Sequence, residues 1–439
     1  MEAPRIVKLY LEMLRQRLSA LHHRIWNKGL MRSGLVTGVT VALLMIALAV
    51  VYREHGLGNF HRLKAKIATT ERQDVVAPRP GGREAIVLQR TRLMGDTAPE
   101  FISATILPGR GMNVLQIAAY LPGRGEVNLM ASPPLETAAS AMSGTGDDAG
   151  GQQSLAMGGA FELPWAGSIW GTPAQAGGHL STAWRGHAIA LPATDSEGAE
   201  ARGGLLLARS AESADTNPLP DGGHAQAEFH TGDFGARWPS KTDVTVTLLL
   251  SSRSIEVTVA ARNDGDGPEP IGIGWQPRFA ILDGNRSQMR LHIPGEVREE
   301  VRDRKTGLPS GVLLPVAGTS YDFTMPGGAR LGTVNLDDSF GALHQNLLDP
   351  GPVAELIDSV NGYGLRLTVL SPTIKVMRVV SPANGDYVSI SPQFNFDDPF
   401  GKEWSKDTDT GMVVLQPGES TQWKMRLELF ALDGSQAPM

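Results

Sequence analysis

The segment VTVTLLLSSRSIEVTVA, residues 244–260, carries an apolar side chain at every second position on both sides of its SSRS turn. Such alternation is typical of a β-strand with one buried face, because successive side chains point to opposite faces of a sheet. Two alternating runs joined by a short polar turn predict an antiparallel hairpin. The segment therefore predicts a protein built from sheets.

The same alternation returns at residues 422–429, near the end of the chain, while sustained helical periodicity is scarce beyond residue 83. The sequence VVAPRPGG at 75–82 is typical of a linker at a domain boundary. We therefore expect residues 83–439 to form one large, mainly β domain, an antiparallel β-sandwich. Two stretches of its sequence are expected to be surface loop insertions: Thr137 to Ala160, and Thr194 to Gly223.

The chain contains 40 basic and 46 acidic residues, a net charge of −6, and no cysteine. Residues 1–72 hold 12 of the basic and only 4 of the acidic residues, so residues 73–439 carry a net charge of −14. An acidic body argues against a nucleic-acid partner, because nucleic acids bind basic surfaces. The lack of cysteine excludes disulfides, thiolate nucleophiles and zinc–thiolate sites. We predict no metal site and no cofactor.

Residues 34–52, GLVTGVTVALLMIALAVVY, form an uncharged run of 19 residues. As a helix this run would be roughly 28 Å long, close to the ~30 Å hydrocarbon core of a bilayer. It is longer than the ~7 to 15 apolar residues of a signal peptide, so we expect an uncleaved transmembrane helix. Basic residues flank both ends almost equally and decide little about orientation. The simplest topology is a single span in the inner (cytoplasmic) membrane with a periplasmic C-terminal body.

Residues 1–33 are expected to form an amphipathic cytosolic head, and residues 53–82 a juxtamembrane segment and linker. The head has apolar residues at alternating spacings of four and three: Val7, Leu11, Leu14, Leu18, Leu21 and Ile25. A helix with this stripe and adjacent basic residues could lie on anionic lipid or dock on a partner helix. The lipid bilayer and a membrane protein are therefore the expected partners of this part of the chain.

Six segments of the body keep a common order and spacing. They are LPWAGSIWG (163–171), WRGHAIALPAT (184–194), VTVAARNDGDGPEPIGIGWQPRF (257–279), LDDSFGAL (336–343), YVSISPQFNFDDPFG (387–401) and VLQPGEST (414–421). Together they resemble the aldose 1-epimerase, or galactose mutarotase-like, family over roughly residues 84–432. The resemblance implies a large antiparallel β-sandwich with a carbohydrate cleft on one concave face. It also implies exchange of sugar anomers, in which a base deprotonates the anomeric hydroxyl while an acid protonates the ring oxygen.

The residues implied by this resemblance depart from the family pattern. Gln276 stands where the family has an acid His, and Ser391 where it has the base Glu. The Asn-Arg-Ile turn reads Gly-Ser-Ile at 167–169, and the Leu-His-Gly-Gly motif best matches Ala-Arg-Gly-Gly at 201–204. Asp337 alone is clearly kept. Neither Gln nor an unactivated Ser can replace an acid or a carboxylate base near neutral pH.

Two further residues complete the predicted binding site. Arg278, where the family has Tyr, would favour an anionic or uronic ligand over a neutral hexose. Trp165 is one of several tryptophans that could stack on a sugar, although core packing is the simpler interpretation for most of them. The predicted substrate-binding residues are Asp337, Gln276, Arg278, Ser391 and Trp165. Relocated proton-transfer groups remain an alternative, with a base at Asp397 or Asp398 and an acid at His179, His187, His224 or His230.

Three functions follow from this sequence. The first is a membrane-anchored carbohydrate-binding protein with an impaired catalytic cleft, acting as an accessory subunit. The second is an active aldose 1-epimerase that uses relocated acid and base residues. The third is a structural subunit of a membrane complex with a vestigial cleft.

Overall fold

The computed structural model describes residues 77–92, 97–175 and 177–432, together with Val41 and Met45. Ala77–Met439 forms a compact unit distinct from Met1–Val76. The predicted head at 1–33 and the predicted span at 34–52 lie outside the described residues, apart from Val41 and Met45. Within the described part, no helix is both long and apolar enough to cross a membrane.

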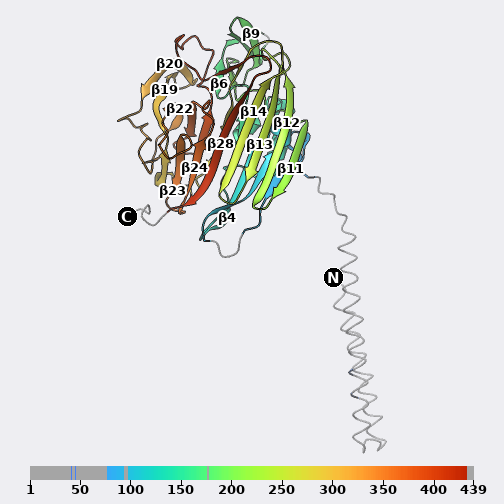
Figure 1. Ribbon diagram of the computed structural model, residues 1–439, viewed down its shortest axis with the longest axis vertical. Coiled ribbons are helices and arrows are strands. Elements are labelled where there is room, and N and C mark those ends of the chain that lie inside the picture. Colours follow the sequence, from blue (N-terminus) through green and yellow to red (C-terminus); the bar gives the residue numbers. More distant parts are fainter. Residues whose placement is uncertain (1–40, 42–44, 46–76, 93–96, 176, 433–439) are drawn as a thin grey trace, which may run out of the picture. The chain divides into compact units, whose positions relative to one another are not determined.

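The larger of the two main sheets has nine strands, and Figure 1 shows most of them side by side. In spatial order they are β11 (Ser213–Leu219), β12 (Gly222–Gly232), β13 (Thr242–Leu250), β14 (Ser254–Asn263), β28 (Ser420–Ala431), β24 (Tyr363–Val369), β23 (Val353–Asp358), β18 (Met289–His292) and β21 (Ala329–Arg330). The predicted hairpin is confirmed, because β13 and β14 pair antiparallel with Val246 opposite Val259. The alternating run at 422–429 lies in β28, between β14 and β24.

The second main sheet runs β20 (Leu308–Pro315), β19 (Gly295–Asp303), β22 (Leu336–Leu343), β25 (Val376–Ser381), β26 (Tyr387–Gln393), β16 (Gly274–Gln276) and β5 (Ala160–Glu162). An eighth strand, β17 (Phe279–Ala280), also pairs with β26. The strands of both main sheets pair antiparallel throughout. The mainly β, antiparallel architecture predicted from the sequence is therefore confirmed.

The two main sheets pack face to face over one continuous apolar core. Alternate residues of β28 enter this core, and Trp423 spans the gap between the sheets. Its indole Nε1 donates to the carbonyl oxygen of Pro392 on β26 at 3.0 Å, and its ring meets that of Phe161 on β5 edge to face. Burial of so many apolar side chains is the main force that holds the sheets together.

Smaller elements surround the sandwich. They are a four-stranded sheet of β1 (Ile86–Gln89), β2 (Glu100–Leu107), β3 (Asn113–Leu121) and β4 (Gly125–Asn128), a three-stranded sheet of β7 (Thr172–Pro173), β8 (His179–Trp184) and β9 (His187–Pro192), and the pairs β6 (Ser168–Trp170) with β10 (Glu200–Arg202) and β15 (Glu269–Ile271) with β27 (Val413–Leu415). The helices described within residues 77–432 are α3 (Leu135–Ala141) and α4 (Gln152–Met157), with 3-10 turns η1 (Pro80–Gly82), η2 (Pro108–Arg110), η3 (Gly146–Asp148) and η4 (Arg286–Gln288).

The two predicted loop insertions contain regular structure. Most of α3 and all of α4 fall between residues 137 and 160, and both helices pack buried residues against the body. The stretch from 194 to 223 contains β10 and β11. The Gly, Ser and Ala content of the first stretch gave no signal for its helices. Short helices gain most of their stability from tertiary packing, which the local sequence does not reveal. Both predicted insertions thus contain short helices or strands in addition to loops.

Replacing Leu427 with Ala tests the packing of the central strand. Leu427 is fully buried on β28, between Ile255 and Leu367 of its neighbours. Truncation leaves a cavity, so the free energy of unfolding in denaturant should fall by about 2 to 5 kcal/mol. Leu249→Ala, on the exposed side of β13, is the control and should change it by less than about 0.5 kcal/mol. Equal effects would contradict the assigned core face.

Candidate functional site

The outer face of the eight-stranded sheet carries polar residues that strand alternation places there. Met377 and Val379 of β25 point into the core, so Arg378 between them points to the other face. In the sheet register Arg378 lies opposite Ser391 of β26 on one side and Ser339 of β22 on the other. Three adjacent strands thus present a guanidinium flanked by two hydroxyl-bearing residues.

Arg378 is buried and holds two carboxylates. Its Nη2 lies 2.7 Å from Oδ1 of Asp337, and its Nη1 lies 3.2 Å from Oδ1 of Asp397. The side chain of Arg378 is 8% exposed, whereas that of Asp337 is 49% exposed. Burial raises the pKa of Asp337, but the nearby Arg378 outweighs burial and holds that pKa below its ordinary value. Asp337 is therefore an ionised, open hydrogen-bond acceptor and a weak base.

Two glutamates lie beside this ion pair. Glu162 on β5 is almost completely buried, and its Oε2 accepts a hydrogen bond from the backbone N–H of Gly167 at 3.3 Å. Burial raises the pKa of Glu162 to about 7, against the opposing effect of Arg378. On β19, burial raises the pKa of Glu299 well above its ordinary value, and Asp397 raises it further. We call Arg378, Asp337, Asp397, Glu162 and Glu299 the charged cluster.

Asp397 and Asp398, the residues predicted as a relocated base, bind the turn that carries β6. Oδ1 of Asp397 accepts from the backbone N–H of Ser168 at 2.7 Å, in addition to its bond with Arg378. Oδ1 of Asp398 accepts from the backbone N–H of Trp170 at 3.0 Å, and burial raises its pKa to about 7. Both side chains are buried. Their present contacts hold the loop after β26 against the turn at 167–169.

The structure brings three of the five predicted binding residues onto neighbouring strands. Asp337 on β22 accepts a hydrogen bond from Arg378 of β25, which lies opposite Ser391 of β26. Gln276 lies on β16, which pairs with β26 at Gly274 and Gln393, two residues away from Gln276 and Ser391. Ser391 is buried, and its hydroxyl lies 3.2 Å from that of Ser389. Asp337 and Gln276 are the more accessible members of this group.

The other two predicted residues are engaged elsewhere. Arg278 donates from Nη1 to the carbonyl oxygen of Ala156 at 2.5 Å, and its guanidinium lies 4.8 Å from the centre of the Tyr387 ring. Trp165 is fully buried, and its indole stacks on Trp238 at 5.5 Å between ring centres. Neither contact provides the open ring face or free guanidinium that the sequence interpretation assumed.

The four histidines considered as a relocated acid lie outside the eight-stranded sheet. His224 and His230 are on β12 of the nine-stranded sheet, and Nδ1 of His230 lies 3.0 Å from Oδ1 of Asp243. His179 and His187 are on β8 and β9, the two strands of a small surface hairpin. None of the four is on a strand that carries Ser391 or Arg378.

Sequence reasoning did not select Arg378, Glu162 or Glu299 as site residues. Arg378 stands alone in the apolar run VMRVV at 376–380, and Glu162 in AFELP at 160–164. Burying a charge is costly unless it is paired, so a single charged residue in such a run indicates a buried partner. That signal was available in the sequence, but it does not identify the partners.

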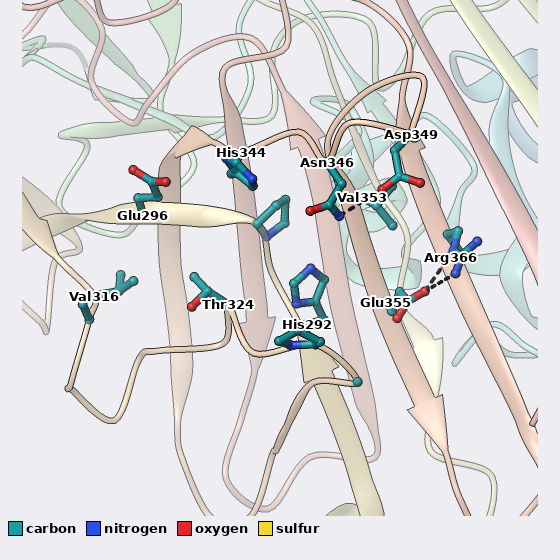
Figure 2. Close-up of a pocket in the computed structure, with 14 residues that line it drawn as sticks. His292, Glu296, Val316, Thr324, His344, Asn346, Asp349, Val353, Glu355 and Arg366 are labelled. Atoms are coloured by element: carbon teal, nitrogen blue, oxygen red, sulfur yellow. Dashed lines mark hydrogen bonds and ion pairs between the residues drawn. The ribbon is translucent and has the colours of Figure 1, made fainter. Parts of the chain in front are cut away.

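A separate pocket of about 590 Å³ lies where β18, β19, β23 and β24 meet two loops. Figure 2 shows Glu296, His344 and Asn346 along one side of it, and His292 along the opposite side. Nδ1 of His292 lies 3.1 Å from the carbonyl oxygen of Met325. The pocket therefore contains imidazoles and carboxylates together. Among the described residues, no three His, Asp or Glu side chains are placed to hold a metal ion.

The chain has recognisable relatives in sequence and in fold. The model of the aldose 1-epimerase family matches residues 153–428. No curated protein sequence matches the chain.

Several solved structures are similar in fold. A galactose mutarotase-like protein from Clostridium acetobutylicum has a TM-score of 0.59 and 12% identity, over 79% of this chain and 99% of its own. The GalM/aldose epimerase homologue from C. elegans has a TM-score of 0.57 and 14% identity, over 75% of this chain and 96% of its own. A putative aldose 1-epimerase from Escherichia coli K12 has a TM-score of 0.55 and 15% identity, over 79% of this chain and 100% of its own. At these identities the likeness extends to the fold, which is galactose mutarotase-like.

The raised pKa of Glu162 predicts a pH-dependent stability. The folded state holds this proton with a pKa of about 7, against 4.5 without the fold, so the free energy of unfolding should fall as pH rises from about 4.5 through 7. Glu162→Gln should remove part of that fall, at most about 3 kcal/mol. Denaturant unfolding at pH 5 and pH 8 measures both proteins. The exposed Glu126→Gln is the control, and a fall as steep in Glu162→Gln as in wild type would contradict the assignment.

Proposed function

Because the chain belongs to the aldose 1-epimerase family, we propose that it binds a carbohydrate on the outer face of the eight-stranded sheet without exchanging the anomers of that sugar. The observation that carries the proposal is the pair of ion contacts from Arg378 to Asp337 and Asp397. They occupy the face where the family resemblance implies the proton-transfer residues. Ser391, at the position of the family's base, lies directly beside Arg378.

Anomer exchange needs a base and an acid that face each other across the sugar, each with a pKa near the working pH. Asp337 is open to solvent, but the lowered pKa that Arg378 imposes makes it a weak base. Glu162 has a pKa of about 7, which suits proton transfer, yet it is 2% exposed beneath the turn at 167–169. Asp337 is therefore accessible, but its pKa is too low for a general base. Glu162 has a suitable pKa, but a sugar cannot reach it.

The same face retains what sugar binding requires. Pockets for small ligands use a few fixed polar groups to orient the ligand. The half-exposed carboxylate of Asp337 can accept bonds from sugar hydroxyls, and the amide of Gln276, whose Oε1 is buried, can donate from its NH₂ group. Arg378 fixes the position of Asp337, so the acceptor is already oriented before a ligand arrives.

We also propose that the body works beside a membrane as an accessory subunit. The uncharged run at 34–52 and the basic head support a single span in the inner membrane, with the body in the periplasm. The charge of −14 on residues 73–439 would hold the body away from anionic lipid headgroups. A partner that handles the bound sugar, such as a transporter or a polysaccharide enzyme, fits this location. The alternative is a purely structural role in a membrane complex.

One observation favours a second candidate, an active epimerase that uses a different site. The pocket of Figure 2 contains His292 and His344 together with Glu296, the side-chain types that proton transfer needs. Its volume of about 590 Å³ lies within the range of small-ligand pockets. The sugar would then react between β18 and β19 rather than over Arg378.

Polarimetry of freshly dissolved α-glucose and α-galactose decides between these functions. The full-length protein in a mild detergent should leave the rate of mutarotation at the buffer value, because no accessible base and acid face each other near Arg378. Acceleration would overturn the proposed function. If His292→Gln then removed the acceleration while Glu162→Gln kept it, the reaction would belong to the pocket of Figure 2.

Purification in a mild detergent tests the accessory role. The chain should be recovered from the membrane fraction together with a protein that handles carbohydrate, because the head and the uncharged run offer it a contact within the bilayer. A variant that lacks residues 1–52 should lose this partner. Recovery of a lone monomer from the membrane would contradict the accessory role without touching sugar binding.

A further inference from the structure

A pocket of about 320 Å³ lies beside the β6–β10 pair, and Arg202 of β10 lines it. Arg202 and Trp165 line it, together with Gln152 and Thr194. Among the described residues that line the pocket, Arg202 alone is charged and none carries a carboxylate. The pocket thus differs from that of Figure 2, which Glu296, Asp349 and Glu355 line.

The guanidinium of Arg202 is held at one end only. Its Nε lies 3.1 Å from Oγ of Ser168 and 3.2 Å from Oε1 of Glu200. Glu200 in turn accepts a hydrogen bond from Oγ of Ser168 at 2.5 Å, so the two residues that hold Nε of Arg202 are also bonded to each other. In the described part of the chain, neither terminal nitrogen of Arg202 has a partner, and the side chain is 37% exposed. This arrangement leaves a fork of oriented donors free for a planar anion.

Trp165 supplies a second free donor. Its indole nitrogen Nε1 is buried and has no hydrogen-bond partner among the described residues. Four other buried tryptophans all donate from Nε1 to a backbone carbonyl oxygen: Trp238, Trp275, Trp404 and Trp423. Buried polar groups are almost always paired, so the unpaired N–H of Trp165, a residue that lines the pocket, indicates a missing acceptor.

We propose that this pocket binds the anionic group of an acidic sugar, a carboxylate or a phosphate, through Arg202 and Trp165. An anion in this position accepts from the free end of the guanidinium and from the indole N–H. Both bonds would be worth more than in water, because Trp165 is fully buried. The fixed ring of Trp165, stacked on Trp238, keeps its donor in place before the ligand arrives.

The pocket adjoins the face that the proposed function uses, and the inference rests on that function. Burial raises the pKa of Asp337 and Arg378 lowers it, with a further lowering from Arg202. Arg202 therefore lies near Asp337 as well as in the pocket wall. One sugar could place its hydroxyls on Asp337 and its anionic group in the pocket.

This proposal attributes the selectivity for acidic sugars to Arg202 rather than to Arg278. The sequence singled out Arg278 because it replaces a family Tyr, but its Nη1 already donates to the carbonyl oxygen of Ala156. Arg278 also lies over the ring of Tyr387. Arg202, at the position that best matches a family His, has its terminal nitrogens free instead.

Isothermal titration calorimetry on the full-length protein in a mild detergent tests the inference. The probes are methyl β-D-glucuronide, glucose 6-phosphate and the neutral methyl β-D-glucoside. At least one acidic probe should bind about tenfold more tightly than the glucoside, as expected for a charge-assisted pair of bonds. Which acidic probe binds better distinguishes a carboxylate ligand from a phosphate ligand.

Three variants locate the effect. Arg202→Gln should abolish the preference for acidic probes, and Trp165→Phe, which keeps the ring and removes the donor, should reduce it severalfold. Arg278→Gln is the matched control and should keep the preference. Circular dichroism of each variant checks that it folds, and only folded variants are compared.

Each outcome decides the matter. Equal affinity for the glucoside and both acidic probes overturns the inference and leaves sugar binding intact. A preference that survives in Arg202→Gln, or is lost in Arg278→Gln, also overturns it. If none of the three probes binds, both this inference and the proposed function fail for these sugars.

Discussion

The outer face of the eight-stranded sheet depends on one buried guanidinium, that of Arg378. Its bonds to Asp337 and Asp397 connect β22, β25 and the loop after β26, and Asp397 in turn holds the turn that begins β6. A buried charge without its partner is strongly destabilising, typically by about 3 to 5 kcal/mol, so these segments are constrained together. Burial raises the pKa of Glu162 on β5 and of Glu299 on β19, but both lie close enough to Arg378 for its charge to lower each pKa in opposition.

This ionic arrangement bears directly on function. A catalytic face for anomer exchange needs an accessible base whose pKa lies near the working pH. Here the accessible carboxylate, Asp337, is paired with Arg378, and the two nearby carboxylates with a pKa of about 7, Glu162 and Asp398, are buried. This arrangement is the basis of the proposal that Asp337 accepts bonds from sugar hydroxyls and that the face does not catalyse anomer exchange. In the proposed function Asp337, the residue that matches the family pattern, binds sugar, while Gln276 and Ser391 stand at the positions of the family's acid and base.

The sandwich was predictable because its signal is repeated along the chain. The alternating runs at 244–260 and 422–429 became β13, β14 and β28, the centre of the nine-stranded sheet. The sequence pointed to Asp337 and Asp397, but not to their common partner Arg378, because the strands that carry the charged cluster are far apart in sequence and meet only through sheet register. Trp165 shows a second limit of prediction from sequence. Its residue type indicated a surface for sugar stacking, but in the fold its ring is buried and only its N–H lacks a partner among the described residues.

Exchange-spectroscopy NMR on the α and β anomers of galactose and glucuronic acid, combined with saturation transfer from the protein, tests the central claim most directly. One sample then reports binding and anomer exchange together. If Arg378 has turned the cleft into a binding face, saturation should pass to at least one sugar while anomer exchange stays at the buffer rate. Exchange between anomers above the buffer rate, on a sugar that receives saturation, would contradict the account.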